Sequence, residues 1–318
     1  MKIGKVHFPG NIFLAPMANV TNIPFRLMCR NYGASMAYSE MISSDAVIYE
    51  SSKAFSRGLS CKGEKPFGIQ IFGNSPDIIS RAALKIEETY QPDIIDVNFG
   101  CPAYLLVKDG SGSALLQSPD LIYSIVKELC ETVSTPVTAK IRVLEDVERT
   151  VQIAGLIEKA GACAITVHGR TQQQHYAGKA NHEYAKRIKC EVTIPVIANG
   201  DIIDEISAKD TLEYTGCDGI MIGRAAMGNP FLFRRISHYL KTGEILEYNV
   251  CRQRTADLEE YLGLLKKYDL TDTVNLRSHA QWFTKGIRGG KNIRNRIADA
   301  KDIDEIIESV RQMCGDAS

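Results

Sequence analysis

Short runs of apolar and β-branched residues recur through the first 225 residues, and segments of helical period separate them. Such runs are typical of buried strands, whereas apolar residues that return every three or four positions are typical of helices packed on a core. The runs predict strands at residues 12–15, 36–39, 68–72, 94–97, 137–141, 164–167, 196–198 and 219–222. The helical segments predict helices at residues 75–90, 118–133, 145–160 and 205–214.

Strands that alternate with helices predict an α/β fold, a (β/α)8 TIM barrel. A doubly wound open sheet is the alternative, but it would usually have fewer strands and a single switch-point crevice. From about residue 252 only helical periods remain, around 258–265, 274–286, 293–300 and 303–313. We therefore predict a barrel domain over residues 1–240 and a C-terminal helical domain over residues 250–318, with the boundary within 238–250.

The composition fits this division. A chain of 318 residues is long enough for a barrel of about 250 residues and an extension of about 70. Basic and acidic residues number 38 each, so a nucleic-acid partner would need a local basic patch. The N-terminus MKIGKVHFPGN lacks the apolar stretch of a secretory signal, and no window is apolar enough to span a bilayer. We expect a soluble, cytoplasmic protein that does not associate with membranes.

The nine cysteines are scattered along the chain and form no C-x-x-C pair. This distribution argues against a disulfide framework and a zinc finger, and it fits a reducing cytosol. No histidine pair has the spacing of metal ligands, so we expect no metal site.

Polar residues and glycines lie within or directly after most of the predicted strands. Active sites of barrels lie at the C-terminal strand ends, and polar residues in apolar strands reduce stability unless they are used. The candidates are Pro16, Met17, Ala18, Gln70, Asn98, Cys101, Lys140, His168, Arg170, Asn199, Gly200, Asp201, Gly223 and Arg224.

Several of these candidates have two interpretations. The segments at 199–201 and 223–230 supply glycines and an arginine at the last two strands, where barrels often bind phosphate, although each also reads as an ordinary turn. Lys140 either faces an anion or an electron-rich ring, or forms an ion pair. His168 either donates a hydrogen bond to a cofactor or is structural. Gln70 either recognises a heterocycle edge or bonds within the core.

Cys101 differs from the other cysteines because it follows a strand and lies between a glycine and a proline. A thiol at that position can act as a nucleophile or as an acid, since its ordinary pKa of about 8.5 keeps it protonated at neutral pH. The residues themselves leave the role open. The segment GSGSALL at 110–116 lacks the full G-x-G-x-x-G pattern, and we interpret it as a turn into a helix.

The predicted helical domain contains RSHAQWFTKGIRGGKNIRNR at 277–296, with six basic residues, no acidic residue and the only tryptophan of the chain. This composition is typical of a surface that contacts a phosphate backbone. The alternative is a solvated helix face, because residues 299–308 supply five acidic residues as compensation.

Seven stretches of the barrel region, in order, resemble the tRNA-dihydrouridine synthases. They are LAPMANVTNIPFR (14–26), GIQIFG (68–73), DVNFGCPAYLLVKDGSGSALL (96–116), TAKIR (138–142), TVHGRTQQQHYAGKA (166–180), VIANGDI (196–202) and IGRAAMGNPFLF (222–233). WFTKGIRGGKNIR (282–294) resembles the helical domain of that family.

The resemblance implies FMN as cofactor, NADPH or NADH as reductant and tRNA as partner, with no stable protein partner. It implies that Pro16, Met17, Ala18, Gln70, Lys140, His168, Asn199, Gly200, Asp201, Gly223 and Arg224 bind FMN. Cys101 would be the catalytic acid, which protonates C5 of a uridine whose C6 receives hydride. Asn98 and Arg170 would hold the base or the cofactor, and Arg277, Lys285, Arg288, Lys291 and Arg294 would contact the tRNA. The target base would have to leave its stack to reach the barrel.

Two positions depart from the family pattern. Asn19 stands where glycine is more common, and Tyr104, Leu105 and Leu106 stand where lysines are common. Two other functions remain open: a small-molecule FMN barrel of the dihydroorotate-dehydrogenase type, and a tRNA-binding protein without turnover.

Overall fold

The computed structural model describes residues 1–61, 63–271 and 275–315. Position 274, where one predicted helix begins, and positions 316–318, at the end of the predicted helical domain, lie outside these ranges.

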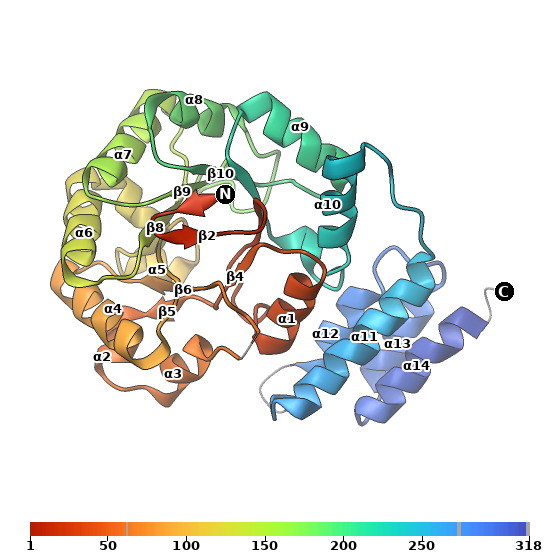
Figure 1. The fold of residues 1–318 in the computed structure, drawn as a ribbon. Coiled ribbons are helices and arrows are strands. Elements are labelled where there is room, and N and C mark those ends of the chain that lie inside the picture. Colours follow the sequence, from red (N-terminus) through yellow and green to blue (C-terminus); the bar gives the residue numbers. More distant parts are fainter. Residues whose placement is uncertain (62, 272–274, 316–318) are drawn as a thin grey trace.

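Parallel strands close into a barrel at the centre of the molecule (Figure 1). They are β3 (Ile12–Leu14), β4 (Met36–Tyr38), β6 (Phe67–Phe72), β7 (Ile94–Phe99), β8 (Val137–Arg142), β9 (Ile165–His168), β10 (Val196–Asn199) and β11 (Gly219–Ile222). Each strand pairs in parallel with the next in this order, and β11 pairs with β3. The predicted barrel is therefore confirmed. The doubly wound sheet is excluded, because an open sheet has two free edges.

A small hairpin covers the N-terminal end of the barrel. It consists of β1 (Lys2–Ile3) and β2 (Val6–His7), which pair antiparallel and lie across the barrel in Figure 1. Ile3 and Phe8 are buried against inward-facing residues of the barrel such as Phe13 and Met36. This apolar layer fills one end of the barrel, so polar chemistry is confined to the other end.

The side chains of each strand alternate between the barrel interior and the surrounding helices. On β7, Ile95, Val97 and Phe99 pack in the outer core, whereas Ile94 belongs to the inner layer. The same alternation places Asp96 and Asn98 inside the barrel. The outer faces of the strands are apolar, and the inner faces become polar toward the C-terminal end.

Helices surround the barrel. The helices predicted from the pattern are α4 (Pro76–Tyr90), α6 (Pro119–Thr132), α7 (Val147–Lys159) and α9 (Glu205–Thr215). The less regular stretch after β4 contains β5 (Ile42–Ser43), α2 (Ser44–Ile48) and α3 (Ser52–Gly58). The remaining elements are α1 (Ile23–Asn31), α5 (Tyr104–Lys108), α8 (Glu183–Glu191), α10 (Leu232–Thr242) and the 3-10 helices η1 (Gly112–Gln117) and η2 (Arg224–Ala226).

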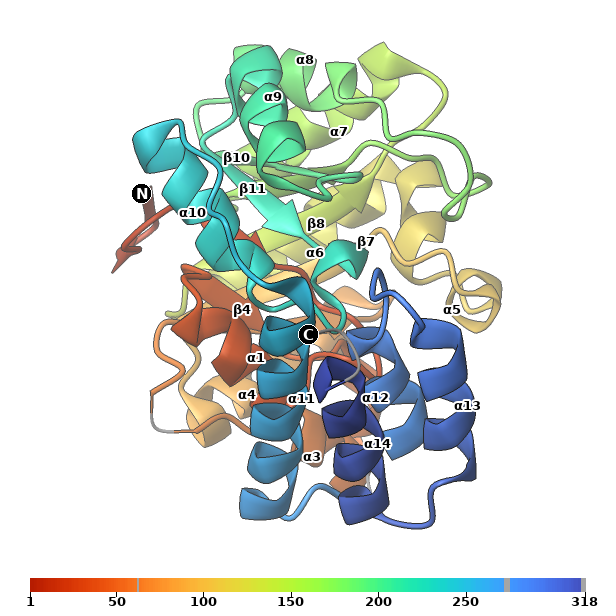
Figure 2. The same cartoon turned by 90° about the vertical axis from the view of Figure 1, so that its right-hand side faces the viewer.

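In the described part of the chain, four α-helices follow the barrel: α11 (Val250–Lys267), α12 (Leu276–Phe283), α13 (Gly290–Asp299) and α14 (Ile303–Gly315). We call them the helical module. They pack beside α1, and Figure 2 shows α12 and α13 on the same side of the molecule as α5, which follows the C-terminal end of β7. Asn22 Nδ2 donates to the Tyr261 hydroxyl at 2.8 Å, and the Tyr32 hydroxyl donates to Asp257 Oδ1 at 2.6 Å. These buried polar contacts fix the module against the barrel.

Candidate active site

A chain of buried hydrogen bonds leads from the barrel interior to the loop that carries Cys101. Thr138 Oγ1 and Gln70 Nε2 donate to the two carboxylate oxygens of Asp96, at 2.6 and 2.7 Å. Asn98 Nδ2 donates to Gln70 Oε1 at 2.9 Å, and Asn98 Oδ1 accepts from the backbone N–H of Cys101 at 2.8 Å. Both ends of the Asn98 amide are thereby engaged. Asn98 orients the Cys101 loop.

Asp96 is fully buried at the base of this chain. Burial raises the pKa of its carboxyl from 3.8 to about 6, although hydrogen bonds from Thr138 and Gln70 and the positive charge of Lys140 oppose the rise. At neutral pH Asp96 is therefore ionised, and a carboxylate only accepts hydrogen bonds. The Gln70 side chain must direct its NH2 group, rather than its oxygen, toward Asp96.

Residues of η1 also hold the Cys101 loop in place through hydrogen bonds. The Cys101 carbonyl accepts hydrogen bonds from the backbone N–H and the hydroxyl of Ser113, at 3.0 and 2.9 Å. A Cβ on Gly112, whose φ is +61°, would lie 2.8 Å from that carbonyl oxygen, so glycine is required there. The segment GSGSALL thus forms a turn into a 3-10 helix that supports Cys101.

The Cys101 thiol keeps its proton at neutral pH. Burial raises its pKa, and the effect exceeds the opposing influence of the Ala103 backbone N–H and of the cations Arg142 and Lys140. A protonated thiol at the end of a barrel strand favours the role of an acid over that of a nucleophile, which would need the thiolate.

Arg142 joins two loops at the barrel mouth. The residue is 2% exposed, and Nε donates to the Gly100 carbonyl at 2.8 Å. Nη1 donates to the carbonyls of Thr171 and His175, at 2.9 and 2.7 Å. Arg142 therefore ties the Cys101 loop to the loop between β9 and α8.

Lys140 and His168 lie inside the mouth. Lys140 Nζ donates to Asn199 Oδ1 at 3.0 Å, across from β8 to β10, and burial lowers its pKa from 10.5 to about 8. The pKa of His168 lies far below its ordinary value, first because of burial and then because of four cations, Lys140, Arg142, Arg170 and Arg224. The imidazole is therefore neutral, and it lies in a field of concentrated positive charge.

The segment after β10 is shaped by its glycine. Gly200 has φ +120°, and a Cβ there would lie 2.6 Å from Ala180 Cβ and 3.0 Å from His168 Cδ2. Asp201 accepts two hydrogen bonds from Arg170 Nη2, at 2.7 and 2.8 Å, and lies 3.7 Å from Arg224 Nη2. One carboxylate thus serves two arginines.

These features fit a bound phosphate group. The cations outnumber the carboxylates at the mouth, and Nη1 of Arg170 is buried with no hydrogen-bond partner among the described residues. A dianionic phosphate would balance the charge and satisfy that group. Gly223 faces the predicted loop at 16–18, since a Cβ on it would lie 3.8 Å from Met17 Sδ. The ends of β3 and β11 therefore meet beside this region.

The predicted tRNA-contacting residues lie on α12, on α13 and on the segment between these helices. We call this set the α12–α13 patch: Arg277, Lys285, Arg288, Lys291 and Arg294. Two of the acidic residues that follow have partners outside this patch: Asp304 pairs with Lys266 of α11 at 3.1 Å, and Glu305 accepts from the Lys301 backbone. The Arg277 Nε donates to the Ala300 carbonyl, which leaves part of its guanidinium in a structural role.

The two departures from the family pattern have clear positions. Asn19 adopts φ +59°, a conformation that asparagine tolerates better than most residues, and its N–H donates to Glu40 Oε2 at 2.9 Å. Tyr104 and Leu105 lie at the start of α5 with exposed fractions of 74% and 75%. An aromatic and aliphatic surface therefore follows the Cys101 loop.

Four residues of the mouth were not among the predicted site residues: Asp96, Thr138, Arg142 and Tyr176. The first three follow the period of two on β7 and β8, where polar residues alternate with apolar ones, so this signal was present in the sequence. Tyr176 lies on the β9–α8 loop, with the guanidinium of Arg224 4.5 Å and that of Arg142 5.5 Å from its ring centroid. No periodic pattern marks a loop residue.

The fold and site define an α/β-barrel enzyme with a cationic mouth and a protonated thiol. The family model for dihydrouridine synthase (Dus) matches residues 13–317, and the chain belongs to this family. Enzymes of this family are flavin-dependent oxidoreductases.

Curated relatives match over almost their whole length. The chain is 38% identical to tRNA-dihydrouridine synthase B of Pseudomonas aeruginosa, covering 98% of this chain and 95% of the relative. It is 37% identical to tRNA-dihydrouridine synthase B of Escherichia coli strain K12, covering 98% of each. A solved structure of nitroalkane oxidase from Streptomyces ansochromogenes matches with a TM-score of 0.43 and 18% identity, covering 69% of this chain and 66% of that one.

Neither a membrane span nor a metal cluster is found in the described part of the chain. No helix there is both long and apolar enough to cross a bilayer. No group of three or more His, Cys, Asp or Glu side chains is arranged to hold a metal ion within the same ranges.

Proposed function

We propose that this protein reduces specific uridines of tRNA to dihydrouridine, with FMN as the bound flavin and NADPH or NADH as the reductant. The observation that carries the proposal is the protonated Cys101 thiol, held by Asn98 and Ser113 at the mouth of a cationic barrel. The family to which the chain belongs supports the same reaction.

The flavin phosphate is assigned to Arg170, Arg224 and the backbone of the segment that begins at Asn199. Lys140 and His168 lie deeper, where a cation and a neutral imidazole donor suit the polar edge of the flavin ring. Gln70 has a spare N–H beyond its bond to Asp96, so it can also donate there. Pro16, Met17, Ala18 and Gly223 form the wall where β3 and β11 end.

Cys101 acts as the proton donor to C5 of the uracil. When bound, the reduced flavin supplies the hydride that adds to C6. The thiol is suited to its task because its raised pKa keeps the proton available at neutral pH, while Lys140 and Arg142 stabilise the thiolate that remains after transfer. Asn98 and Arg170 fix the loops on either side of the base.

The substrate RNA contacts the barrel mouth and the α12–α13 patch. We assign the barrel to residues 1–240 and the tRNA-binding helical domain to residues 250–318. Figure 2 shows α12 and α13 on the same side of the molecule as α5, which follows the Cys101 loop, and this arrangement suits a folded RNA that presents one unstacked base. The place of such a reaction is the cytoplasm, where tRNA is modified.

The test uses purified protein loaded with FMN, unmodified tRNA transcript and NADPH. Mass spectrometry of the digested RNA should show uridines that have gained two hydrogen atoms. Orotate and dihydroorotate serve as the small-molecule control. Turnover of these compounds without change to the tRNA would refute the proposal in favour of a small-molecule enzyme, and a colourless protein that only binds tRNA would refute the flavin role.

A further inference from the structure

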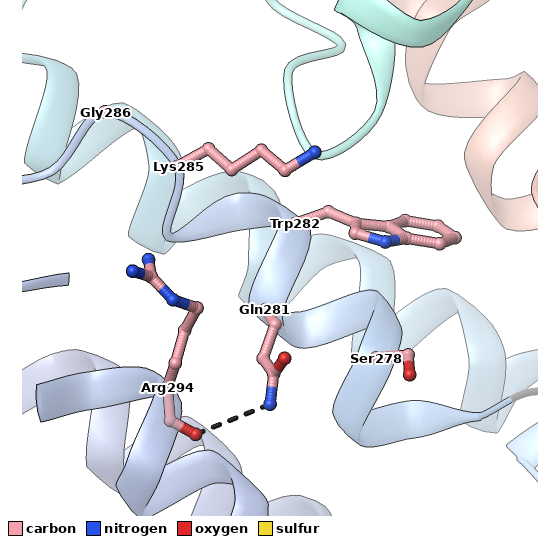
Figure 3. A pocket seen from close by; sticks show the side chains of 6 residues that line it. All are labelled: Ser278, Gln281, Trp282, Lys285, Gly286 and Arg294. Atoms are coloured by element: carbon pink, nitrogen blue, oxygen red, sulfur yellow. Dashed lines mark hydrogen bonds between the residues drawn. The ribbon is translucent and has the colours of Figure 1, made fainter. Parts of the chain in front are cut away.

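A pocket of about 550 Å³ lies in the helical module (Figure 3). Ser278, Gln281, Trp282 and Lys285 line it along one side of α12 and just beyond its end, and Arg294 of α13 lies opposite. Gln281 Nε2 donates to the Arg294 backbone carbonyl at 3.4 Å, which links the two helices at the floor of the pocket. Its volume is in the range of small-ligand sites.

The lining is cationic and aromatic. Arg294 Nη1 makes a long hydrogen bond of 3.3 Å to the Thr284 hydroxyl, and no carboxylate pairs with Arg294 or Lys285 among the described residues. On the other side of the module, by contrast, Lys266 pairs with Asp304 and Arg311 pairs with Glu259. The module therefore neutralises one face internally and leaves positive charge at the pocket.

Trp282 is fixed in its position within the pocket. The His279 ring stacks on the indole at 4.0 Å between centroids, and Tyr261 holds His279 through a 2.6 Å hydrogen bond to Nδ1. Burial lowers the pKa of His279 to about 4, so the ring is neutral and suited to stacking. The indole of Trp282 is thus a rigid platform, with little conformational freedom to lose when a ligand binds.

We propose that this pocket binds one unstacked nucleotide of the substrate RNA, distinct from the uridine that is reduced. The base stacks on Trp282 and its phosphate lies between Lys285 and Arg294, while Gln281 and Ser278 supply hydrogen-bond groups for the base edge. Indole stacking and two cations are what recognition of a single-stranded nucleotide requires. This inference rests on the proposed function, because it assumes that the partner is the RNA substrate.

The chain has a single tryptophan, so its fluorescence reports on this pocket alone. The experiment titrates the FMN-loaded protein with unmodified tRNA transcript and, separately, with heparin, a polyanion without bases. The flavin content is constant in both titrations. Binding is measured independently by filter retention for the tRNA and by calorimetry for heparin, and dihydrouridine is measured in the same tRNA samples.

The expected result is that tRNA quenches the Trp282 emission in proportion to the bound fraction, whereas heparin binds with little quenching. Trp282→Leu should weaken tRNA binding about tenfold, and Trp282→Phe, which retains an aromatic face, should weaken it less. The double variant Lys285→Ala and Arg294→Ala should make the negative slope of the logarithm of the tRNA binding constant against log salt less steep by roughly 1.5. Lys266→Ala, which removes a cation that is already paired with Asp304, is the matched control and should change neither the tRNA affinity nor its salt dependence.

Three results would overturn the inference. If tRNA binds and is reduced while the emission of Trp282 and the affinity of Trp282→Leu stay at wild-type values, the pocket holds no nucleotide, yet the proposed function stands. If heparin quenches as strongly as tRNA, the pocket recognises phosphate without a stacked base. Absence of both tRNA binding and dihydrouridine would instead refute the proposed function, and the inference with it.

Discussion

Replacing Arg142 by methionine should destabilise the protein and loosen the Cys101 loop at the same time. The guanidinium is buried and makes three hydrogen bonds, to the carbonyls of Gly100, Thr171 and His175. Methionine fills a similar volume but donates none of them, so three carbonyl groups lose their partner.

The size of the effect follows from these contacts. A hydrogen bond from a charged donor contributes about 1.5 kcal/mol or more, but the loop carbonyls can regain water when the loops relax. We therefore expect a loss of about 3 kcal/mol in the free energy of unfolding. For a chain of this length that corresponds to a decrease in Tm of about 4–5 °C. Because the positive charge of Arg142 lowers the pKa of Cys101, its removal should raise that pKa further.

Thermal denaturation measures the change in Tm. The rate of Cys101 alkylation as a function of pH, followed by peptide mass spectrometry, measures the change in the thiol pKa. Arg142→Lys, which retains the charge, should restore the thiol pKa but only part of the stability. Arg187→Met, which removes an exposed pair with Glu148, is the control and should change the stability by less than about 1 kcal/mol. An Arg142→Met protein with wild-type Tm and alkylation profile would refute the reasoning.

Three further predictions concern the cofactor site and the module. Gly200→Ala should abolish FMN retention, because the new Cβ would collide with Ala180. The control Gly243→Ala, also at positive φ but with no neighbour within 4 Å, should retain FMN and lower the free energy of unfolding by about 1 kcal/mol. Equal flavin content in the two variants would contradict this prediction. Since Lys140 has a pKa of about 8, it is charged below that pH and neutral above it, and an anionic ligand favours the charged form. FMN binding at pH 9 should therefore take up a proton and weaken as the pH rises, and calorimetry in buffers of different ionisation enthalpy should show no such uptake in Lys140→Met. Tyr261→Phe should lower the stability by about 1–2 kcal/mol without changing the flavin spectrum, since it removes the partner of His279 Nδ1; an unchanged Tm would contradict the assigned contact.

The sequence predicted the barrel because each buried strand carries its own periodic signal. The predicted strand at 164–167 and the observed β9 (Ile165–His168) differ by one residue, which is a matter of where hydrogen bonding begins. The two-residue strands β1 and β2 were missed, because a segment that short has no period to detect.

The candidate site was predictable in position but not in its pairings. The strand ends predicted that Asp201 and Arg170 lie at the same end of the barrel. Only the structure shows that Arg170 Nη2 donates to Asp201, while Nη1 has no hydrogen-bond partner among the described residues. The alternation along β8 marked Arg142 as an inward-facing polar residue, but its bonding role was not predictable, because its partners are backbone carbonyls of two loops and carbonyls carry no sequence signature. The sequence also could not show which basic residues the acidic residues at 299–308 pair with. The structure shows that Asp304 pairs with Lys266 of α11, which is not part of the α12–α13 patch.

The role of Cys101 as proton donor is tested most directly in a single turnover. The FMN-loaded protein is reduced anaerobically and mixed with unmodified tRNA, and flavin absorbance and dihydrouridine are followed together. Cys101→Ala should retain its flavin but react at least about a hundredfold more slowly, the range for loss of a general acid, whereas Cys190→Ala, which changes an exposed cysteine, should react like the wild type. The wild-type rate should fall only as the pH rises through the elevated pKa of the thiol. A Cys101→Ala protein that forms dihydrouridine at the wild-type rate would contradict the assignment.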